Sequence, residues 1–270
     1  MYEIIDASNC FNLRTLEYDN ESRAKGVAGN ISRALWRTDK IGLLRISQAA
    51  GVGTITQMDP VGFCYHSNCV EIEYLLDSIC DLTYPDGTHV TLNPGDALVH
   101  QPGQPHGMQS LIPKNMQILA IYSCAPSSVD RFEFDKDTDK HANDKWKVAR
   151  ATDVPITPCE DPGVEIRILF ENNEQPLSFA EITLKPGASI PLENFTTVNN
   201  CDEMVVVRSG KGIAIYPDKV YSLYRDITMY NYAGQPYKYV NIGNEDLHLL
   251  FTWSAYSYQD IERKIKKLEG

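Results

Sequence analysis

The sequence predicts an all-β protein built from two copies of one folding unit. Short β-rich runs between tight turns predict the class, and an internal repeat predicts the two copies. The residues Gly-Gln-Pro-His at 103–106 return as Gly-Gln-Pro-Tyr at 234–237, so His106 corresponds to Tyr237 at an offset of 131 (237 − 106 = 131). Because the histidine becomes a tyrosine, we expect only the first copy to have kept its chemistry.

Two further landmarks keep this spacing. Glu71 opens an apolar run, and Glu203 opens a similar run 132 residues later (203 − 71 = 132). The segment 118–123 matches 249–254 at an offset of 131 (249 − 118 = 131). Three landmarks in register indicate a true repeat of one fold unit.

Turn signals divide the chain into short strands. A Pro-Asp-Gly turn within 83–88 predicts a hairpin, and an Asn-Pro-Gly-Asp turn occupies 93–96. The second half has matching turns at 185–188 and 209–212. This spacing favours β-sandwiches or barrels over alternating helices and strands.

We expect three parts along the chain. Residues 1–126 form the first β-unit with an N-terminal arm, 127–147 form a polar linker, and 148–270 form the second unit. The linker is rich in aspartate, which predicts a solvated connection with a short helical turn. The basic segment 263–267 predicts a short C-terminal helix.

The composition excludes several classes of function. The 270 residues include 43 % apolar side chains, enough for real cores, while the net charge of −11 argues against a nucleic-acid partner. We find no membrane-spanning run and no signal-peptide pattern, so we expect a cytoplasmic protein without membrane contact. Seven scattered cysteines predict mainly buried thiols rather than a disulfide framework.

Candidate metal ligands gather in the first copy. Cys64 and His66 are two residues apart, so a strand would point both to one face, and Glu71 follows shortly after. His106 arrives from a distant segment after the turn at Pro102 and Gly103. Two imidazoles and a carboxylate inside a barrel would make a metal site with open positions for water and substrate.

These residues resemble the cupin superfamily. Its second motif, Gly, five residues, Pro-x-Gly, two residues, His, is matched by Gly95, Gly103 and His106, with Gln101 in place of the first proline. Its first motif, Gly, five residues, His-x-His, three or four residues, Glu, six residues, Gly, is matched only in part. The residues at its successive positions are Met58, Cys64, His66, Glu71 and Ser78.

The resemblance covers about residues 40–125 and, more weakly, 178–255. It implies a bicupin, with two tandem jelly-roll β-barrels in one chain. It also implies a homodimer, because cupins often pair through edge strands, and a small-molecule substrate.

Two assignments of the first motif remain open. In the preferred one Glu71 is the glutamate and Cys64 takes the place of the first histidine. In the other, His66 and Asn68 take the two positions of the His-x-His pair, and Glu73 is the glutamate. We expect one divalent ion: ligation by Cys64 would favour zinc, and a site without it would favour iron, manganese or nickel.

Other residues are candidates for catalysis or substrate binding near the ion. His100 precedes His106 by six residues and is interpreted as a catalytic base, a ligand or a hydrogen-bonded core histidine. Tyr74 is a second catalytic candidate, and Gln101 and Gln104 are candidates for binding substrate.

Simpler interpretations stand beside these. His66 and His106 would be satisfied core histidines if the barrel had lost its metal. The remaining histidines, His89, His141 and His248, are expected to be structural. In the second copy Glu203 is retained, but no histidine precedes it and Tyr237 ends the motif, so that barrel is expected to be structural.

The sequence therefore predicts a metal-dependent bicupin enzyme acting on a small polar organic molecule. Within that class a dioxygenase stands slightly ahead of an isomerase, decarboxylase or hydrolase, since one fold hosts many reactions. The alternative is a metal-free bicupin that binds a metabolite or sugar without catalysis. A purely structural, oligomer-forming protein is a third hypothesis.

Overall fold

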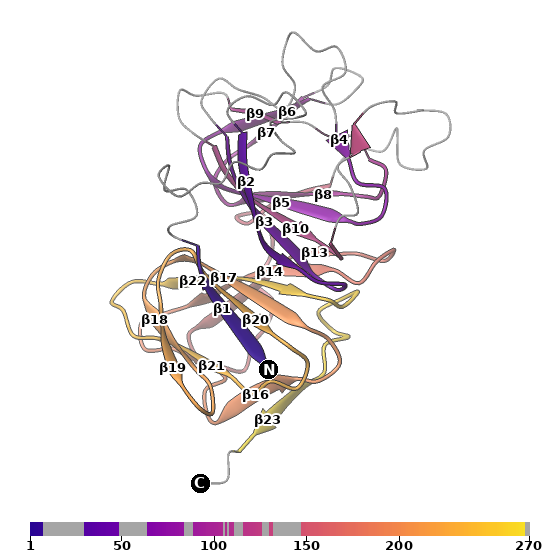
Figure 1. Ribbon diagram of the computed structural model, residues 1–270. Coiled ribbons are helices and arrows are strands. Elements are labelled where there is room, and N and C mark those ends of the chain that lie inside the picture. Colours follow the sequence, from indigo (N-terminus) through magenta and orange to yellow (C-terminus); the bar gives the residue numbers. More distant parts are fainter. Residues whose placement is uncertain are drawn as a thin grey trace. The chain divides into compact units, whose positions relative to one another are not determined.

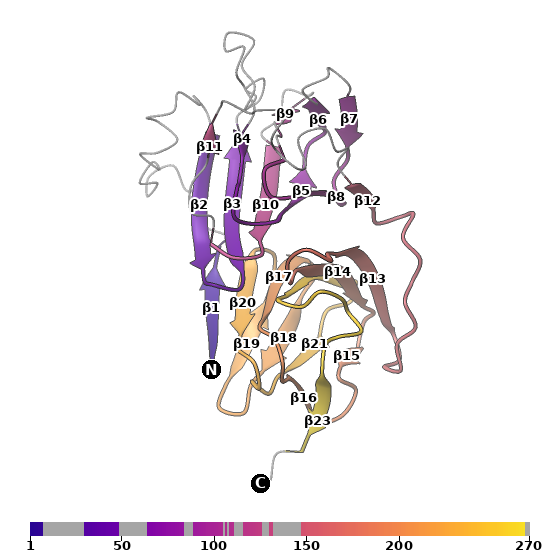
Figure 2. The same cartoon turned by 90° about the vertical axis from the view of Figure 1, so that its right-hand side faces the viewer.

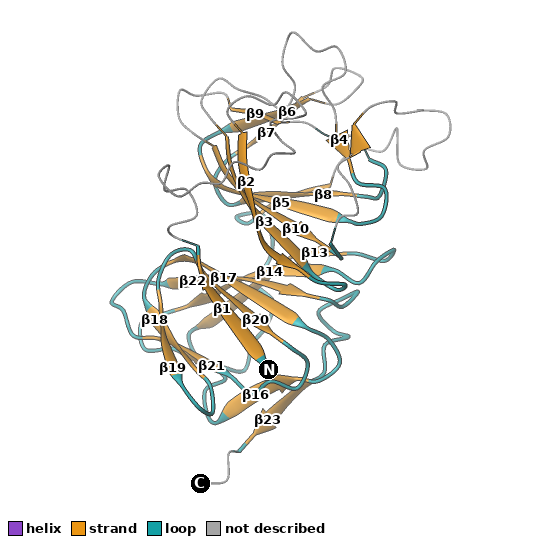
Figure 3. Ribbon diagram, viewed as in Figure 1, coloured by secondary structure: helices purple, strands orange, loops and turns teal. Residues whose placement is uncertain are grey.

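A computed structural model gives the structure of the chain. It describes residues 1–7, 30–48, 64–83, 89–104, 106, 108–110, 116–125, 130–131 and 147–267. Every regular element in these ranges is a β-strand, as Figure 3 shows. The described part accordingly contains no helix that could cross a membrane.

The chain divides into two compact units by its internal contacts. One comprises Cys10–Arg150, and the other comprises Met1–Asn9 together with Ala151–Gly270. We call them the N-terminal and the C-terminal barrel. Each is described by itself below, with the strand labels of Figure 1.

The N-terminal barrel has a six-stranded sheet in the order β12-β8-β5-β10-β3-β2, in which β2, β3 and β10 lie side by side (Figure 2). A three-stranded sheet, β7-β6-β9, and a pair, β11-β4, complete it. Its strands are β2 Asn30–Arg37, β3 Gly42–Gln48, β4 Cys64–Tyr65, β5 Glu71–Asp77, β6 Cys80–Thr83, β7 His89–Leu92, β8 Asp96–His100, β9 Met108–Ser110, β10 Met116–Tyr122, β11 Asp130–Arg131 and β12 Lys147–Arg150.

The C-terminal barrel repeats this plan. Its six-stranded sheet runs β1-β20-β17-β22-β14-β13, beside a four-stranded sheet β15-β21-β18-β19 and a pair β16-β23. Its strands are β1 Tyr2–Asp6, β13 Val164–Glu171, β14 Ser178–Leu184, β15 Ser189–Ile190, β16 Phe195–Val198, β17 Glu203–Ser209, β18 Gly212–Ile215, β19 Val220–Leu223, β20 Ile227–Asn231, β21 Lys238–Asn241, β22 Leu247–Trp253 and β23 Arg263–Lys266.

The strand registers confirm the internal repeat. Glu71 pairs with Tyr122 and His100 in the N-terminal barrel. Glu203 pairs in the same way with Trp253 and Asn231 in the C-terminal barrel. Positions in one barrel can therefore be assigned to positions in the other with an offset of 131 or 132.

The barrel boundaries differ from the expected ones at two strands. β1 was expected in an arm of the first unit, but it pairs with β20 in the C-terminal barrel, where Figure 1 draws it in indigo. β12 begins at the expected end of the linker, yet it pairs with β8 and closes the N-terminal sheet. Each six-stranded sheet therefore has one outer strand from outside the expected bounds of its barrel: β12 in the N-terminal sheet and β1 in the C-terminal sheet. Apart from β11 and Lys147, the expected linker and its helical turn lie outside the described residues.

The expected C-terminal helix is wrong. Residues Arg263–Lys266 form β23, which pairs antiparallel with β16. The Arg263 guanidinium lies 4.2 Å from the ring centroid of Tyr258 and 5.1 Å from that of Trp253. Strand pairing and this cation–π stacking outweigh a local helix propensity, which is only a weak preference.

The turns match the sequence-based expectation where they are described. Gly95 and Gly187 adopt positive φ values of 97° and 80°, which glycine reaches without a steric cost. The β6–β7 hairpin is confirmed by its antiparallel pairing from Cys80 to Thr83, although the Pro-Asp-Gly turn itself lies outside the described residues.

Candidate metal centre

One face of β5 presents two acidic side chains to the interior of the N-terminal barrel. Glu71 and Glu73 are two residues apart on this strand, so their side chains share a face. Both are buried, with exposed fractions of 3 % and 6 %. A buried carboxylate is costly without a cation or hydrogen-bond donors, so each needs a partner.

A turn brings the two histidines to Glu71. The main-chain N–H of Gly103 donates to the carbonyl of His66 at 2.9 Å, which ties the turn at 101–104 to the segment before β5. Gly103 has a φ of 80°, so the turn favours glycine at this position. His106 follows two residues after the turn, and both imidazoles are buried.

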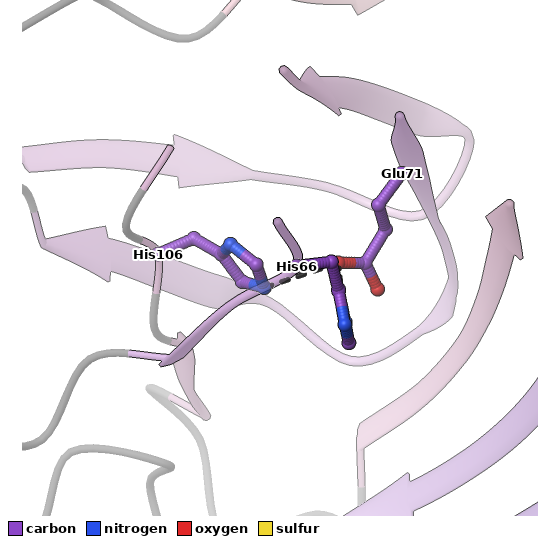
Figure 4. Close-up of side chains that lie close together, drawn as sticks. All are labelled: His66, Glu71 and His106. Atoms are coloured by element: carbon purple, nitrogen blue, oxygen red, sulfur yellow. Dashed lines mark ion pairs between the residues drawn. The ribbon is translucent and has the colours of Figure 1, made fainter. Parts of the chain in front are cut away.

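The three side chains converge on one point. Oε2 of Glu71 lies 3.3 Å from Nε2 of His66 and 3.1 Å from Nε2 of His106, as Figure 4 shows. Two ligands at a right angle, each about 2.1 Å from an ion, are about 3.0 Å apart. Oε2 of Glu71 is buried and accepts no hydrogen bond of good geometry. The set of two neutral nitrogens and one carboxylate oxygen thus fits a divalent transition metal.

The surroundings fix the tautomer of His106. Its Nδ1 lies 3.1 Å from the main-chain carbonyl oxygen of Gln104, which can only accept a hydrogen bond. Nδ1 therefore carries the proton, and the lone pair is on Nε2, the atom that faces Glu71. This carbonyl–imidazole arrangement is typical of histidines that bind metal.

Electrostatics keep Glu71 charged. Burial alone would raise its pKa, but the facing imidazoles of His66 and His106 lower it, and the net pKa lies well below the ordinary range. Tyr122 lies opposite Glu71 in the pairing of β5 with β10. Burial and the Glu71 charge both raise the pKa of Tyr122 well above its usual range, so its hydroxyl stays protonated.

A second carboxylate–imidazole pair lies beside the first cluster. Nε2 of His100 is 2.9 Å from Oε2 of Glu73, and both side chains are buried. The ring of His100 stacks on that of His106, with centroids 4.0 Å apart and an interplanar angle of 21°. Burial, and then the neighbouring His106, lower the pKa of His100, so it is neutral near pH 7. Glu73, His100 and His106 form a second set with metal-ligating atoms in reach of each other.

The structure distinguishes between the two assignments of the first motif. Glu71 faces both His66 and His106, as in the preferred assignment. In the alternative one, Asn68 would be a ligand, but its Nδ2 donates to the carbonyl of Ala125 at 3.2 Å instead. The backbone of Cys64 is in β4, and its side chain lies outside the described part of the structure.

Two other expected roles do not fit this geometry. Tyr74 is buried, but it is an odd number of residues from Glu71 on β5 and so lies on the opposite face from the cluster. Gln104 uses its side-chain Oε1 to accept a hydrogen bond from the main-chain N–H of Gln101 at 2.9 Å. That hydrogen bond closes the turn before His106, so Gln104 helps to position His106. Gln101 itself is partly exposed.

The remaining histidines do not join the cluster in the described residues. His89 is exposed and lies 2.7 Å from Asp81. His248 lies on β22 of the other barrel, where its Nδ1 is 3.1 Å from Glu181. His141 lies outside the described residues.

The equivalent place in the C-terminal barrel is filled by neutral donors. Oε2 of Glu203 accepts hydrogen bonds from Tyr237 Oη and Trp253 Nε1, each at 2.7 Å. Oε1 accepts one from Asn231 Nδ2 at 3.0 Å. Gly234 N–H donates to the carbonyl of Val198, as Gly103 does to that of His66. Val198 therefore stands where His66 stands in the other barrel, and the geometry offers no imidazole to a metal here.

Comparisons with known proteins bear on the fold. No protein-family model and no curated protein sequence matches the chain. A variant of Bacillus subtilis oxalate decarboxylase superposes with a TM-score of 0.62 at 14 % identity, covering 88 % of this chain and 75 % of that one. The chain has the bicupin fold. The jelly-roll class expected for both barrels is thereby confirmed.

Other bicupin structures superpose equally well. Lactobacillus farciminis oxalate decarboxylase in complex with formate gives a TM-score of 0.62 at 12 % identity, covering 88 % of this chain and 84 % of that one. A further structure of the Bacillus subtilis enzyme, studied for its Mn(II) centres, gives a TM-score of 0.61 at 14 % identity and covers 88 % and 75 % of the two chains. At this identity the likeness establishes the fold alone.

Sequence reasoning gave two residues of the site too little weight. Glu73 entered only as an alternative ligand, although its spacing from Glu71 already placed both carboxylates on one face. Tyr122 was visible only as part of a matched segment, where it corresponds to Trp253. The common signal is the internal repeat, which places a side chain with a polar hydrogen, Tyr122 or Trp253, opposite the equivalent glutamate of each half.

Proposed function

We propose that this bicupin is a metal-dependent enzyme whose N-terminal barrel binds one divalent ion and acts on a small carboxylic acid. The observation that carries the proposal is the convergence of two imidazole nitrogens on one buried, charged carboxylate oxygen. A structural role for Glu71 alone would be met by hydrogen-bond donors, as it is for Glu203.

The residues take separate roles in this proposal. His66, Glu71 and His106 hold the ion, and Cys64 remains a candidate fourth ligand. When bound, the ion supplies a Lewis acid with open positions for substrate oxygen atoms. Gln104 holds His106 through its carbonyl oxygen and through the turn that its side chain closes.

His100 is the proposed proton-handling residue. Its Nε2 shares a hydrogen with Oε2 of Glu73, and its ring lies against His106. Glu73 orients the imidazole, and burial keeps it neutral, so it is able to accept a proton. Gln101, partly exposed at the turn, is the remaining candidate for contacting substrate.

Decarboxylation is the preferred reaction. The superposed structures are oxalate decarboxylases, and they share the two-barrel plan over most of both chains. Cleavage of a carbon–carbon bond next to a carboxylate needs a cation for the substrate oxygens and a group that returns a proton to carbon. In this proposal His66, Glu71 and His106 hold the cation, and the hydrogen shared by Nε2 of His100 and Oε2 of Glu73 is the proton that returns to carbon.

Oxygenation is the second candidate. A set of two histidines and one carboxylate with open positions suits non-haem iron(II) oxygenases, and this chain offers that donor set without a third motif histidine. The two reactions differ in their co-substrate. Consumption of dioxygen in proportion to substrate loss would favour the oxygenase, and release of carbon dioxide without net dioxygen uptake would favour the decarboxylase.

Elemental analysis tests the metal site first. Purified chain should contain about one transition metal ion per molecule, and manganese or iron(II) should restore it after chelation. His66→Ala and Glu71→Gln should abolish this stoichiometry, while the matched controls His248→Ala and Glu203→Gln should retain it. Reconstituted protein is then assayed with oxalate and other small carboxylic acids. A metal-free chain whose His66→Ala variant binds ligands normally would favour the non-catalytic bicupin instead.

A further inference from the structure

Two cysteines face each other at the end of the strand pair that carries the candidate metal centre. The main-chain N–H of Ser123 donates to the carbonyl of Val70 at 3.1 Å, and Ser123 Oγ accepts from Val70 N–H at 3.0 Å. These bonds extend the register of β5 and β10 by one residue. The next residues along the two segments are Cys69 and Cys124, which therefore stand opposite each other.

The two cysteines belong to one cluster of packed side chains. Cys69 is buried, and Cys124 is partly exposed. Cys124 Sγ donates to the main-chain carbonyl of Asn68 at 3.8 Å. Asn68 Nδ2 also donates to Cys124 Sγ at 3.5 Å, which holds this sulfur toward the Cys69 segment.

Strand geometry favours a bond between them. The main-chain bond from Ser123 to Val70 continues the antiparallel register of β5 and β10, and opposed Cα atoms in such a register are about 4.5–5.5 Å apart. That separation lies within the range of disulfides, about 4.4–6.8 Å.

The C-terminal barrel supplies an internal control. Cys201 occupies the place of Cys69 (201 − 69 = 132), and Ala255 occupies the place of Cys124 (255 − 124 = 131). The same register holds there, because Ser254 N–H donates to the carbonyl of Asp202 at 3.0 Å. Only the barrel with the histidine cluster has two sulfur atoms at this position.

We propose that Cys69 and Cys124 form a reversible disulfide when a hydroperoxide oxidises the chain. The more exposed Cys124 thiolate attacks one peroxide oxygen, which breaks the O–O bond and leaves a sulfenic acid and one water. The Cys69 sulfur then attacks the Cys124 sulfur, loses its proton, and displaces the second oxygen as water. Two thiols and one hydrogen peroxide give one disulfide and two waters, and the two sulfurs supply the two electrons.

The bond would tie together the strand ends that carry Glu71 and Tyr122, each two residues from a cysteine. It therefore links the redox state of the chain to the strands that hold the histidine cluster. The inference stands on the cysteine geometry and does not depend on a bound ion or on the reaction proposed above.

Peptide mapping of the full-length chain tests the inference. After treatment with hydrogen peroxide, thiols are blocked and the protein is digested without reductant by trypsin and chymotrypsin. Cleavage after aromatic and basic residues isolates Cys69 in 66–74 and Cys124 in 123–131. We expect these peptides joined, with a mass two hydrogens below their sum, and separated again by dithiothreitol.

Matched variants sharpen the result. Cys80→Ala should leave the joined peptides unchanged, and Cys69→Ala should abolish them. Ala255→Cys should create the equivalent bond to Cys201 in the C-terminal barrel. Wild-type mapping decides the matter even if a variant fails to fold. Recovery of Cys124 only as sulfinic acid, or joined to another cysteine, while Cys69 stays a thiol, would overturn the inference.

Discussion

The two barrels bury one glutamate at the same place and satisfy it in opposite ways. Glu71 meets two imidazoles and has a depressed pKa, whereas Glu203 meets a phenol, an indole and an amide. Burial raises the pKa of Glu203, and its hydrogen bonds only partly offset that effect. One fold thus supports a charged carboxylate between imidazoles in one copy and a closed network of neutral donors in the other.

The C-terminal barrel shows how a buried carboxylate is held where no imidazole faces it. The network around Glu203 is complete: Asn231 Nδ2 also donates to Tyr239 Oη at 2.8 Å, and Tyr216 Oη donates to Asn231 Oδ1 at 2.8 Å. Leaving a buried polar group unpaired costs about 1–3 kcal/mol. Tyr237 therefore satisfies the acid through a hydrogen bond at the position where the N-terminal barrel has an imidazole.

The largest expected effect comes from moving the C-terminal chemistry into the N-terminal barrel. His106→Tyr replaces a nitrogen lone pair by a protonated hydroxyl, so we expect metal affinity to fall at least about 100-fold, the upper end of what loss of supporting residues costs. Competition with a chelating dye measures the affinity. The matched control is Tyr237→Phe, which should leave metal content unchanged. Retention of full affinity in His106→Tyr would exclude His106 as a ligand.

A second prediction breaks the closed network instead. Tyr237→Phe removes the hydroxyl that donates to Glu203, so the unfolding free energy should fall by about 1–3 kcal/mol. Thermal unfolding followed by circular dichroism gives the change. Tyr256→Phe, at an exposed tyrosine of the same barrel, should change stability by less than about 0.5 kcal/mol. Equal effects of both variants would show that the network has no stabilising role.

The opposite pKa directions predict opposite pH dependences in metal-free protein. Glu71 has a depressed folded pKa, so its contribution is present above its unfolded pKa of about 4.3 and is lost as pH falls through the folded value. Glu203 has a raised folded pKa, so its contribution is present below about 4.3 and is lost as pH rises through the folded value.

Glutamine variants separate these contributions. Glu71→Gln should weaken the loss of thermal stability on acidification, and Glu203→Gln should weaken the loss as pH rises toward neutrality. Melting curves of both variants over the acid to neutral range provide the measurement. The same slope change in both variants would contradict the assignment of different charge states.

The sequence predicted that His66, Glu71 and His106 lie close together because their spacing resembles the two cupin motifs. Two-residue alternation grouped only Cys64 with His66, whereas Glu71, five residues on, and His106, from a distant segment, were assigned through that resemblance. The His100–Glu73 contact was missed because it depends on the register between β5 and β8, which no local pattern states. Alternation along β5 places Tyr74 on the face opposite Glu71, so Tyr74 does not join the cluster.

Long-range pairing explains the errors in the fold. Tyr2 pairs with Asn231, so the membership of β1 depends on a partner at the other end of the chain. The segment beginning at Arg263 has helix-forming residues but finds strand partners beginning at Phe195. Pattern reasoning was reliable where contacts are near in sequence, and it was wrong where distant strands decide the structure.

The smallest predicted effect concerns the two corresponding turns. Gln104→Ala removes the side-chain oxygen that closes the turn before His106, but leaves the main-chain carbonyl that orients its Nδ1. We expect metal affinity to fall about 10-fold, the low end for residues that position a ligand.

Gln235→Ala removes the corresponding glutamine of the C-terminal barrel, whose Nε2 donates to the carbonyl of Pro236, and should leave metal affinity unchanged. Because the folds of the two turns match, a loss confined to Gln104→Ala would assign the effect to the position of His106 rather than to general loosening of a turn. Equal metal affinity in both variants would show that the main-chain carbonyl of Gln104 alone orients His106.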